Sequence, residues 1–201
     1  RQKTILNNKI TSGDITIPTF IEFQSTKYVI TNIDSFAFKN NSHIKSITFS
    51  EDSKLNSISK KAFSNSNIQK ISIPSTVNNL EDGWCYGTSQ LWKIDLSPEN
   101  KNYSYIDQDH KLIASKSLPN SDTYDTIIFA TRNIPEVSIP SYIKYINSYA
   151  FSQCKFLRFI FFNEDSQLIS IEKDAFSGSS LEKISIPAYT KLKEGWCHKT
   201  P

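Results

Sequence analysis

The sequence predicts a solenoid, in which short coils of the chain stack on one another and share one continuous apolar core. Three observations lead to this fold class. A short apolar phrase returns at steps of 23 or 24 residues on either side of one longer gap, a second phrase lies between its copies, and residues 45–88 match residues 158–201 almost position by position. Because a single coil of this length cannot bury its own apolar face, each coil needs neighbours to complete a core.

The first phrase has the pattern apolar-x-x-apolar-x-apolar and is often followed by proline. Its last positions alternate, which is the period of a β-strand, so we expect the Ile and Leu side chains to point into the core. Proline donates no N–H and ends the pairing of the strand. Copies of the phrase begin at Ile44, Ile68, Leu91, Ile134, Leu157 and Leu181, and Ile15-Thr16-Ile17-Pro18 is an earlier copy.

The second phrase is Ala-Phe, which stands five or six residues before the next copy of the first phrase. We expect it in a tight turn on the wall of the coil opposite the strand, where Phe fills the core. The two Gly-Trp-Cys triplets mark the longer period, whose offset is 113 residues and slips to 112 after one deletion. Ala-Phe occurs at residues 37–38, 62–63, 150–151 and 175–176, and Trp-Cys replaces it at residues 84–85 and 196–197.

Together the two phrases resemble the BspA-type (Treponema-type) leucine-rich repeat, whose pattern is Leu-x-x-Ile-x-Ile-Pro-x-x-Val-x-x-Ile-x-x-x-Ala-Phe-x-x-Cys. Residues 139–154 carry the Ile-Pro, the spaced Ile residues, the Ala-Phe and the Cys of that pattern. The resemblance covers nearly the whole chain, and the Asn/Ser/Lys/Ile bias is similar to that of protist, Trichomonas-like, surface proteins. It implies a leucine-rich-repeat solenoid, a curved and right-handed stack of coils with a parallel β-sheet on the concave face.

Two stretches depart from the short repeat. Residues 97–133 resemble the long repeat variant of the family, in which a β-hairpin projects from the coil, and residues 19–33 hold a smaller insertion around Tyr28-Val29-Ile30. Loops of a solenoid often carry function, and a tolerated insertion is the other interpretation. We expect a single leucine-rich-repeat domain over residues 1–201, a fragment of a longer array, since the chain shows neither a signal core nor a Met.

The composition argues against several classes of function. With 23 basic and 20 acidic residues the net charge is +3, which gives no electrostatic footprint for nucleic acid. No window approaches the ~20 apolar residues that a membrane span requires. The three histidines fall in different coils, and no metal-ligand spacing, phosphate-binding loop or nucleophile elbow is present. We therefore predict a protein that is not an enzyme and that holds no cofactor and no metal.

The three cysteines are expected to be free, buried thiols. Cys85 and Cys197 take the position of Phe in Ala-Phe, and Cys154 takes the inward cysteine position of the family. Neighbouring coils lie roughly 4.8 Å apart, so Cys154 and Cys197, two coils apart, are separated by roughly 10 Å. A disulfide needs Cα atoms within about 7 Å, which excludes this pair and the more distant Cys85.

The outward-facing residues of the strands are mostly small and polar, as an exposed sheet requires. Phe159 and Phe161 are exceptions, because their strand already has a full inward set without them. With Arg158 next to them they form the kind of apolar patch that marks an interaction site. Two other interpretations stay open, namely that a neighbouring loop covers the pair or that the register is shifted by one residue.

Weaker candidates lie on the same face and at the edges of the coils. An aromatic side chain, Trp92, precedes the strand expected at residues 93–96. The outward lysines either contact a partner or form a solvated stripe, and they are Lys70, Lys93 and Lys183. In a secreted eukaryotic protein the two Asn-x-Ser sequons could carry glycans, and these begin at Asn40 and Asn102.

The resemblance implies a non-enzymatic adhesion module of a cell-surface or secreted protein, which recognises a protein or cell-surface ligand through the strand-lined face. An intracellular protein-interaction scaffold that uses the same face is the alternative. A third interpretation is self-assembly. The chain stops before the strand that follows Trp84-Cys85 in the matching half, and an uncapped coil with open strand edges favours end-to-end dimers.

Overall fold

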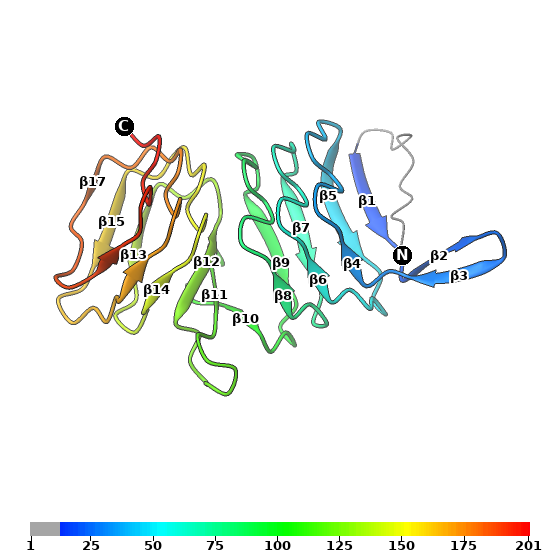
Figure 1. The fold of residues 1–201 in the computed structure, drawn as a ribbon, viewed down its shortest axis with the longest axis horizontal. Coiled ribbons are helices and arrows are strands. Elements are labelled where there is room, and N and C mark those ends of the chain that lie inside the picture. Colours follow the sequence, from blue (N-terminus) through cyan, green and yellow to red (C-terminus); the bar gives the residue numbers. More distant parts are fainter. Residues whose placement is uncertain (1–12) are drawn as a thin grey trace. The chain divides into compact units, whose positions relative to one another are not determined.

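The structure, a computed structural model, describes residues 13–201, and these form two compact units, residues 13–101 and 102–201 (Figure 1). Each unit is a stack of coils with β-strands on two walls. Residues 13–201 contain no helix, and the predicted β-solenoid is confirmed. It follows that this part of the chain has no long apolar helix of the kind that crosses a membrane.

In the first unit, the strands of the first phrase form a parallel sheet, called here the first ladder sheet. Its register places equivalent residues of successive coils side by side, as Ile15 with Ile47 and Ile47 with Ile71. Short parallel strands form another wall of the same coils. The ladder strands are β1 (Gly13–Ile17), β5 (Ile44–Phe49), β7 (Lys70–Ile73) and β9 (Lys93–Leu96), and the other wall holds β4 (Asn32–Ile33), β6 (Ser57–Ile58) and β8 (Asn79–Leu80).

The second unit repeats this plan with a larger second wall. Its parallel second ladder sheet pairs Val137 with Ile160 and Ile160 with Ile184. The strands of this sheet are β13 (Glu136–Ile139), β15 (Phe159–Phe162) and β17 (Lys183–Ile184). The other wall is a six-stranded sheet of β10 (Tyr103–Tyr105), β11 (Leu112–Ser115), β12 (Thr126–Ala130), β14 (Tyr145–Ile146), β16 (Ser170–Ile171) and β18 (Lys191–Leu192).

The long repeat at residues 97–133 forms antiparallel strands, but they lie within a sheet, whereas the sequence predicted a hairpin that projects. β10 pairs with β11 and β11 with β12, and β12 continues into the parallel strands through β14. Burial explains the difference, because Ile113, Ala114 and Phe129 of these strands are buried and their apolar side chains gain free energy in the core. The connecting loop, residues 116–125, stands out from the sheet (Figure 1).

Asp125 ties this loop to the sheet. Its buried carboxylate accepts hydrogen bonds from the backbone N–H and the hydroxyl of Ser117, both at 2.8 Å, and lies 3.2 Å from Nζ of Lys144. Desolvation raises the pKa of the Asp125 carboxyl, but the Ser117 hydrogen bonds and Lys144 outweigh it and hold the pKa below its usual value. The loop is therefore anchored by an ionised carboxylate.

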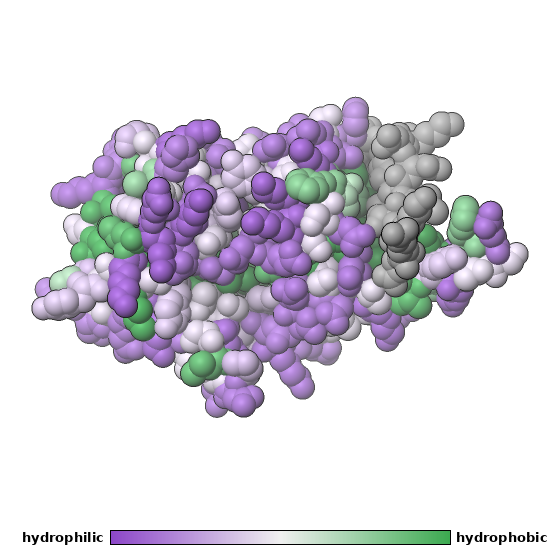
Figure 2. Space-filling view, viewed as in Figure 1, coloured by the Kyte–Doolittle hydropathy of each residue, from purple (hydrophilic) through white to green (hydrophobic). Residues whose placement is uncertain are grey.

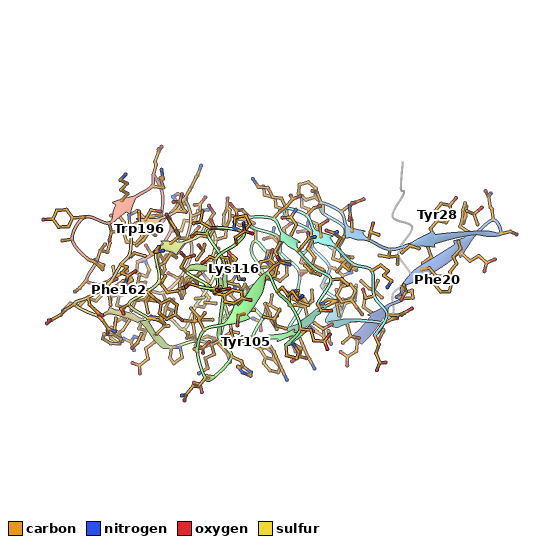
Figure 3. The ribbon with its side chains drawn as sticks, turned by 90° about the horizontal axis from the view of Figure 1, so that it is seen from below. Phe20, Tyr28, Tyr105, Lys116, Phe162 and Trp196 are labelled. Atoms are coloured by element: carbon orange, nitrogen blue, oxygen red, sulfur yellow. The ribbon has the colours of Figure 1, made fainter. Side chains whose placement is uncertain are left out.

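The insertion at residues 19–33 is the element that projects from the coils. β2 (Phe20–Phe23) and β3 (Thr26–Val29) form an antiparallel hairpin that extends away from the stack of the first unit (Figures 1 and 3). Its base is closed by the N–H of Ile30, which donates to the carbonyl of Thr19 at 2.9 Å, and the Thr19 hydroxyl donates to Asp52 of the next coil. Both faces of the hairpin carry exposed apolar side chains.

The Ala-Phe turns share a backbone conformation that explains the Gly-Trp-Cys triplets. Each turn begins and ends with a residue of positive φ, four positions apart. Glycine adopts this left-handed region at no steric cost, and other residues adopt it at a cost of about 1–2 kcal/mol. The positive-φ pairs are Phe36 and Asn40, Lys61 and Asn65, Gly83 and Gly87, Tyr149 and Gln153, Asp174 and Gly178, and Gly195 and Lys199.

Stacked aromatic rings fill the core behind these turns. In the first unit the rings of Phe38 and Phe63 stack with centroids 5.1 Å apart, and Trp84 meets Phe63 edge to face at 5.9 Å. The backbone pairing puts Trp84 at the Ala position and Cys85 at the Phe position, so the indole fills the space that the small thiol leaves. The second unit repeats this arrangement with Phe151, Phe176 and Trp196, at 4.9 and 5.8 Å.

All three cysteines are free thiols, as predicted, and Cys85 and Cys154 are buried. Burial raises the pKa of the Cys154 thiol, and the neighbouring Arg132 guanidinium only partly offsets this effect. The prediction of full burial is wrong for Cys197, which is half-buried. Its coil is the last in the described residues, and the described residues cover only one side of it.

Candidate functional site

The strand β15 settles the register of the outward-facing residues. Ile160 is only 4% exposed, whereas the two flanking residues Phe159 and Phe161 are 37% and 50% exposed. The register is therefore the predicted one, and no described loop covers the pair. Phe159 and Phe161 are called here the phenylalanine patch. The molecular face shown in Figure 2 is largely hydrophilic, with hydrophobic areas confined to separate places.

The phenylalanine patch is an ordered arrangement of rings and charges. The two ring centroids lie 6.5 Å apart with their planes inclined by 28°. The guanidinium of Arg158 lies 5.9 Å from the centre of the Phe159 ring, and its Nε donates to the carboxylate of Glu182 at 2.6 Å. This ion pair joins the residue before β15 to the start of the next coil. It holds the arginine beside the patch.

Sequence reasoning missed a third exposed ring. Phe156 directly precedes the inward Leu157 and is 63% exposed, so three exposed phenylalanines lie within six residues. The signal that could have found it is the same one that identified Phe159, namely a large apolar side chain at a position where the other coils carry polar residues. The matching residue in the first unit is His43.

Charged residues of opposite sign flank the patch across the sheet. The register pairs Phe159 with Glu136 of β13 on one side and with Lys183 of β17 on the other. Phe161 pairs with Ser138 in the same way. Among the residues that the structure describes, neither Glu136 nor Lys183 takes part in an ion pair within the chain. The patch therefore lies between one free carboxylate and one free ammonium group.

The first ladder sheet differs from this at the matching positions. Ser46 and Thr48 of β5 stand where β15 has Phe159 and Phe161. The Thr48 hydroxyl lies 2.9 Å from that of Thr16 on the neighbouring strand, so these side chains bond to each other across the sheet. These outward positions are polar in the first ladder sheet, whereas β15 carries aromatic rings.

Two of the three candidate lysines pair with one carboxylate on this face. Nζ of Lys70 lies 2.8 Å and Nζ of Lys93 lies 3.3 Å from the carboxylate of Asp95. The hydrogen bond to Asp95 raises the pKa of Lys70. Desolvation raises the pKa of Asp95, but the bonds from the two lysines outweigh it and lower the pKa. The predicted basic stripe is thus an ion-paired cluster in the first unit, and Lys183 is separate from it beside the patch.

The remaining predicted residues do not gather into a site. Trp92 is exposed at the start of β9 in the first unit. Asn40 and Asn102 are both exposed, and Asn40 occupies the positive-φ position at the end of its turn. Over residues 13–201, no three His, Cys, Asp or Glu side chains lie close enough together to hold a metal ion. A depression of about 520 Å³ in the first unit is lined mainly by the loops that follow β5, β7 and β9.

The stacked coils, the ladder sheets and the Ala-Phe turns define a leucine-rich-repeat protein. The sequence matches the BspA type Leucine rich repeat region in 6 copies, over residues 15–110 and 111–197. The chain belongs to this family. A comparison of the sequence with curated proteins gives no significant match.

Solved structures similar to this chain come from bacteria. A leucine rich cell surface protein of Faecalibacterium prausnitzii A2-165 shares 20% sequence identity, with a TM-score of 0.68 over 89% of this chain and 42% of that chain. The pneumococcal vaccine antigen PcpA shares 26% identity, with a TM-score of 0.69 over 89% of this chain and 40% of that one. This chain thus spans about two fifths of the length of either protein.

Proposed function

We propose that this chain is a protein-binding module of a cell-surface protein and that the phenylalanine patch of the second ladder sheet is its contact surface. The observation that carries the proposal is the replacement of Ser46 and Thr48 in one half by Phe159 and Phe161 in the other, on equivalent outward positions. The inward Ile47 and Phe49 of β5 recur as Ile160 and Phe162 in β15, so the inward residues of the strand do not account for the two outward rings.

The chemistry of the patch suits a protein partner. Aromatic side chains and arginine are enriched among the residues that contribute most to protein–protein binding. Covering one exposed Phe ring with apolar atoms of a partner contributes about 1.5–3 kcal/mol. Arg158 already pairs with Glu182 beside Phe159, so part of its side-chain entropy is lost before a partner covers it.

The proposed location at a cell surface is supported by the solved structures. One similar protein is described as a leucine rich cell surface protein, and another is a vaccine antigen. A module of such a protein that binds protein or cell-surface ligands through its strand-lined face would act in adhesion.

The test replaces the patch with the residues of the matching half. The double variant Phe159→Ser/Phe161→Thr takes its side chains from β5, where the same backbone carries them. The labelled wild-type chain and the variant are incubated with intact cells or with immobilised surface extracts, and the bound fraction is measured against concentration.

We expect the variant to bind at least about tenfold more weakly, with an unchanged melting temperature. The matched control is Trp92→Ser, which removes an exposed aromatic side chain of the first unit and leaves the patch intact. Equal binding by wild type and the double variant would show that the phenylalanine patch is not the contact surface.

A further inference from the structure

We propose that the second ladder sheet pairs face to face with the same sheet of a second copy of this chain. The proposal names a partner for the surface described above and rests on the assignment of the phenylalanine patch as a contact surface. Its specific basis is the order of three residues across the sheet.

The register of the sheet gives that order directly. Glu136, Phe159 and Lys183 lie side by side on β13, β15 and β17. Neighbouring strands are about 4.8 Å apart, so the Cα atoms of Glu136 and Lys183 flank that of Phe159 at about equal distances. The row is acidic on one side, aromatic in the centre and basic on the other side.

A row of this kind is complementary to itself. A two-fold axis that lies between two facing sheets and runs parallel to β15 reverses the order of the strands and keeps their direction. Phe159 and Phe161 then meet the same residues of the second copy. Glu136 lies opposite the second copy's Lys183, and Lys183 lies opposite the second copy's Glu136. The result is a closed, isologous contact with an aromatic centre and two ion pairs.

The isolated chain leaves these charges without partners. Among the described residues Glu136 and Lys183 form no ion pair within the chain, whereas Lys70 and Lys93 of the first ladder sheet share Asp95. The second copy supplies the missing counter-charges. This pattern favours the same chain as partner, since an unrelated protein that covers the rings has no reason to match both flanks.

Two further features set the strength of the contact. Arg158 directly precedes the central strand and approaches its own copy, but Glu182 neutralises it within each chain. The exposed parts of Phe156, Phe159 and Phe161 amount to ~300 Å² per copy, so the aromatic contact alone is smaller than a standard stable interface. We therefore expect a weak dimer with a dissociation constant on the order of 100 μM.

The test is sedimentation velocity of the full 201-residue chain at concentrations up to about 0.5 mM, a range that brackets the expected constant. The wild type should shift from monomer to dimer. Phe159→Ser/Phe161→Thr should raise the dissociation constant at least about tenfold. Each single charge reversal, Glu136→Lys or Lys183→Glu, places like charges opposite each other and should weaken the dimer by a similar factor.

The double reversal Glu136→Lys/Lys183→Glu exchanges the two flanks and restores both ion pairs, so dimerisation should return to within about threefold of wild type. A merely structural role of either residue would not give this recovery. A wild-type chain that stays monomeric, or a double reversal no better than the single ones, overturns the self-pairing. A monomer that still binds another protein through the patch overturns this inference and leaves the proposed function standing.

Discussion

The two halves of this chain, residues 45–88 and 158–201, share most of their inward residues and differ on the outward face of their first strand. Ile47 and Ile160 occupy the same place in the core, whereas Ser46 and Thr48 are replaced by Phe159 and Phe161. The difference shows that the inward and outward positions of a ladder strand have different roles. The inward positions determine the coil, and the outward positions vary without changing it.

The largest expected effect concerns the inward set, in which the halves are alike. Phe63→Ala and Phe176→Ala each remove the ring that lies between two other aromatic side chains of its unit. Each should lower the free energy of unfolding by about 3–5 kcal/mol because a cavity is left in the core. Urea unfolding measures both. Costs that differ by more than about 2 kcal/mol would show that the two units are not packed alike.

The next comparison is between two carboxylates, one buried in the second unit and one exposed in the first. Asp125 is 1% exposed and its folded-state pKa lies below that of the unfolded chain. Its stabilisation is complete above the ordinary carboxyl pKa of about 4 and is lost as the pH falls through the lowered pKa. Asp125→Asn should cost about 2 kcal/mol at neutral pH and flatten the acid limb of the stability curve.

Asp95→Asn is the matched control, because this carboxylate also accepts bonds from a lysine but lies on the surface. Solvent screens its ion pairs, so the substitution should cost less than about 1 kcal/mol. Thermal melts from pH 2 to pH 7 would separate the two residues. An Asp125→Asn variant with the same acid limb as wild type would contradict the anchoring role of this carboxylate.

Substitution by alanine should destabilise the protein to different extents at two glycines that lie in the same kind of turn. Gly87 and Gly195 both have positive φ, near 77° and 70°. A Cβ on Gly87 would lie 2.0 Å from the side-chain Oδ1 of Asn65, whereas a Cβ on Gly195 meets nothing within 4 Å. We expect Gly195→Ala to cost about 1 kcal/mol from backbone strain alone, and Gly87→Ala to cost about 2 kcal/mol.

Adding Asn65→Ala to the Gly87→Ala variant removes the side chain with which the new Cβ would clash. The difference between the two glycine variants should then largely disappear in chemical denaturation. If it persists, the extra cost of Gly87→Ala arises from the backbone of the turn.

The smallest effect on stability is expected from exchanging the outward residues of the halves. Ser46→Phe/Thr48→Phe places the aromatic pair on β5, and Phe159→Ser/Phe161→Thr removes it from β15. Phe159 and Phe161 are exposed and Ser46 and Thr48 are half-buried on the outward face, and neither exchange alters an inward residue, so each should change the free energy of unfolding by less than about 1 kcal/mol. A large loss in either variant would show that the outward residues also support the coil.

Much of this fold could be predicted, because the ladder repeats a strong physical signal. The alternation of Ile with polar residues assigned Ile160 to the core and Phe161 to the surface, and the coil spacing predicted the free thiols of Cys85 and Cys154. Other features depend on contacts between distant segments, and the spacing of the repeats does not indicate these contacts. The long repeat joins a sheet only because its strands find β14 as a neighbour.

Arg132 shows the same limit for a single residue. An arginine in a turn predicts an exposed side chain, yet Arg132 is 2% exposed. Its guanidinium donates to the carbonyls of Ala130 and Ala150 at 3.1 and 3.0 Å and lies 4.5 Å from the centre of the Phe129 ring. These acceptors come together only in the folded coil, so no local pattern could have indicated them. In the candidate site, the ion pair of Arg158 with Glu182 in the next coil was missed for this reason.

The central claim is that the phenylalanine patch is open in the isolated chain and covered when the chain is bound. Hydroxyl-radical footprinting with mass spectrometry tests this most directly, by measuring the oxidation of Phe159 and Phe161 against that of buried Phe176. In dilute chain the two patch residues should be oxidised and Phe176 protected, and in the bound state all three should be protected. Protection of Phe159 and Phe161 in dilute chain, or their continued oxidation in the bound state, would contradict the account.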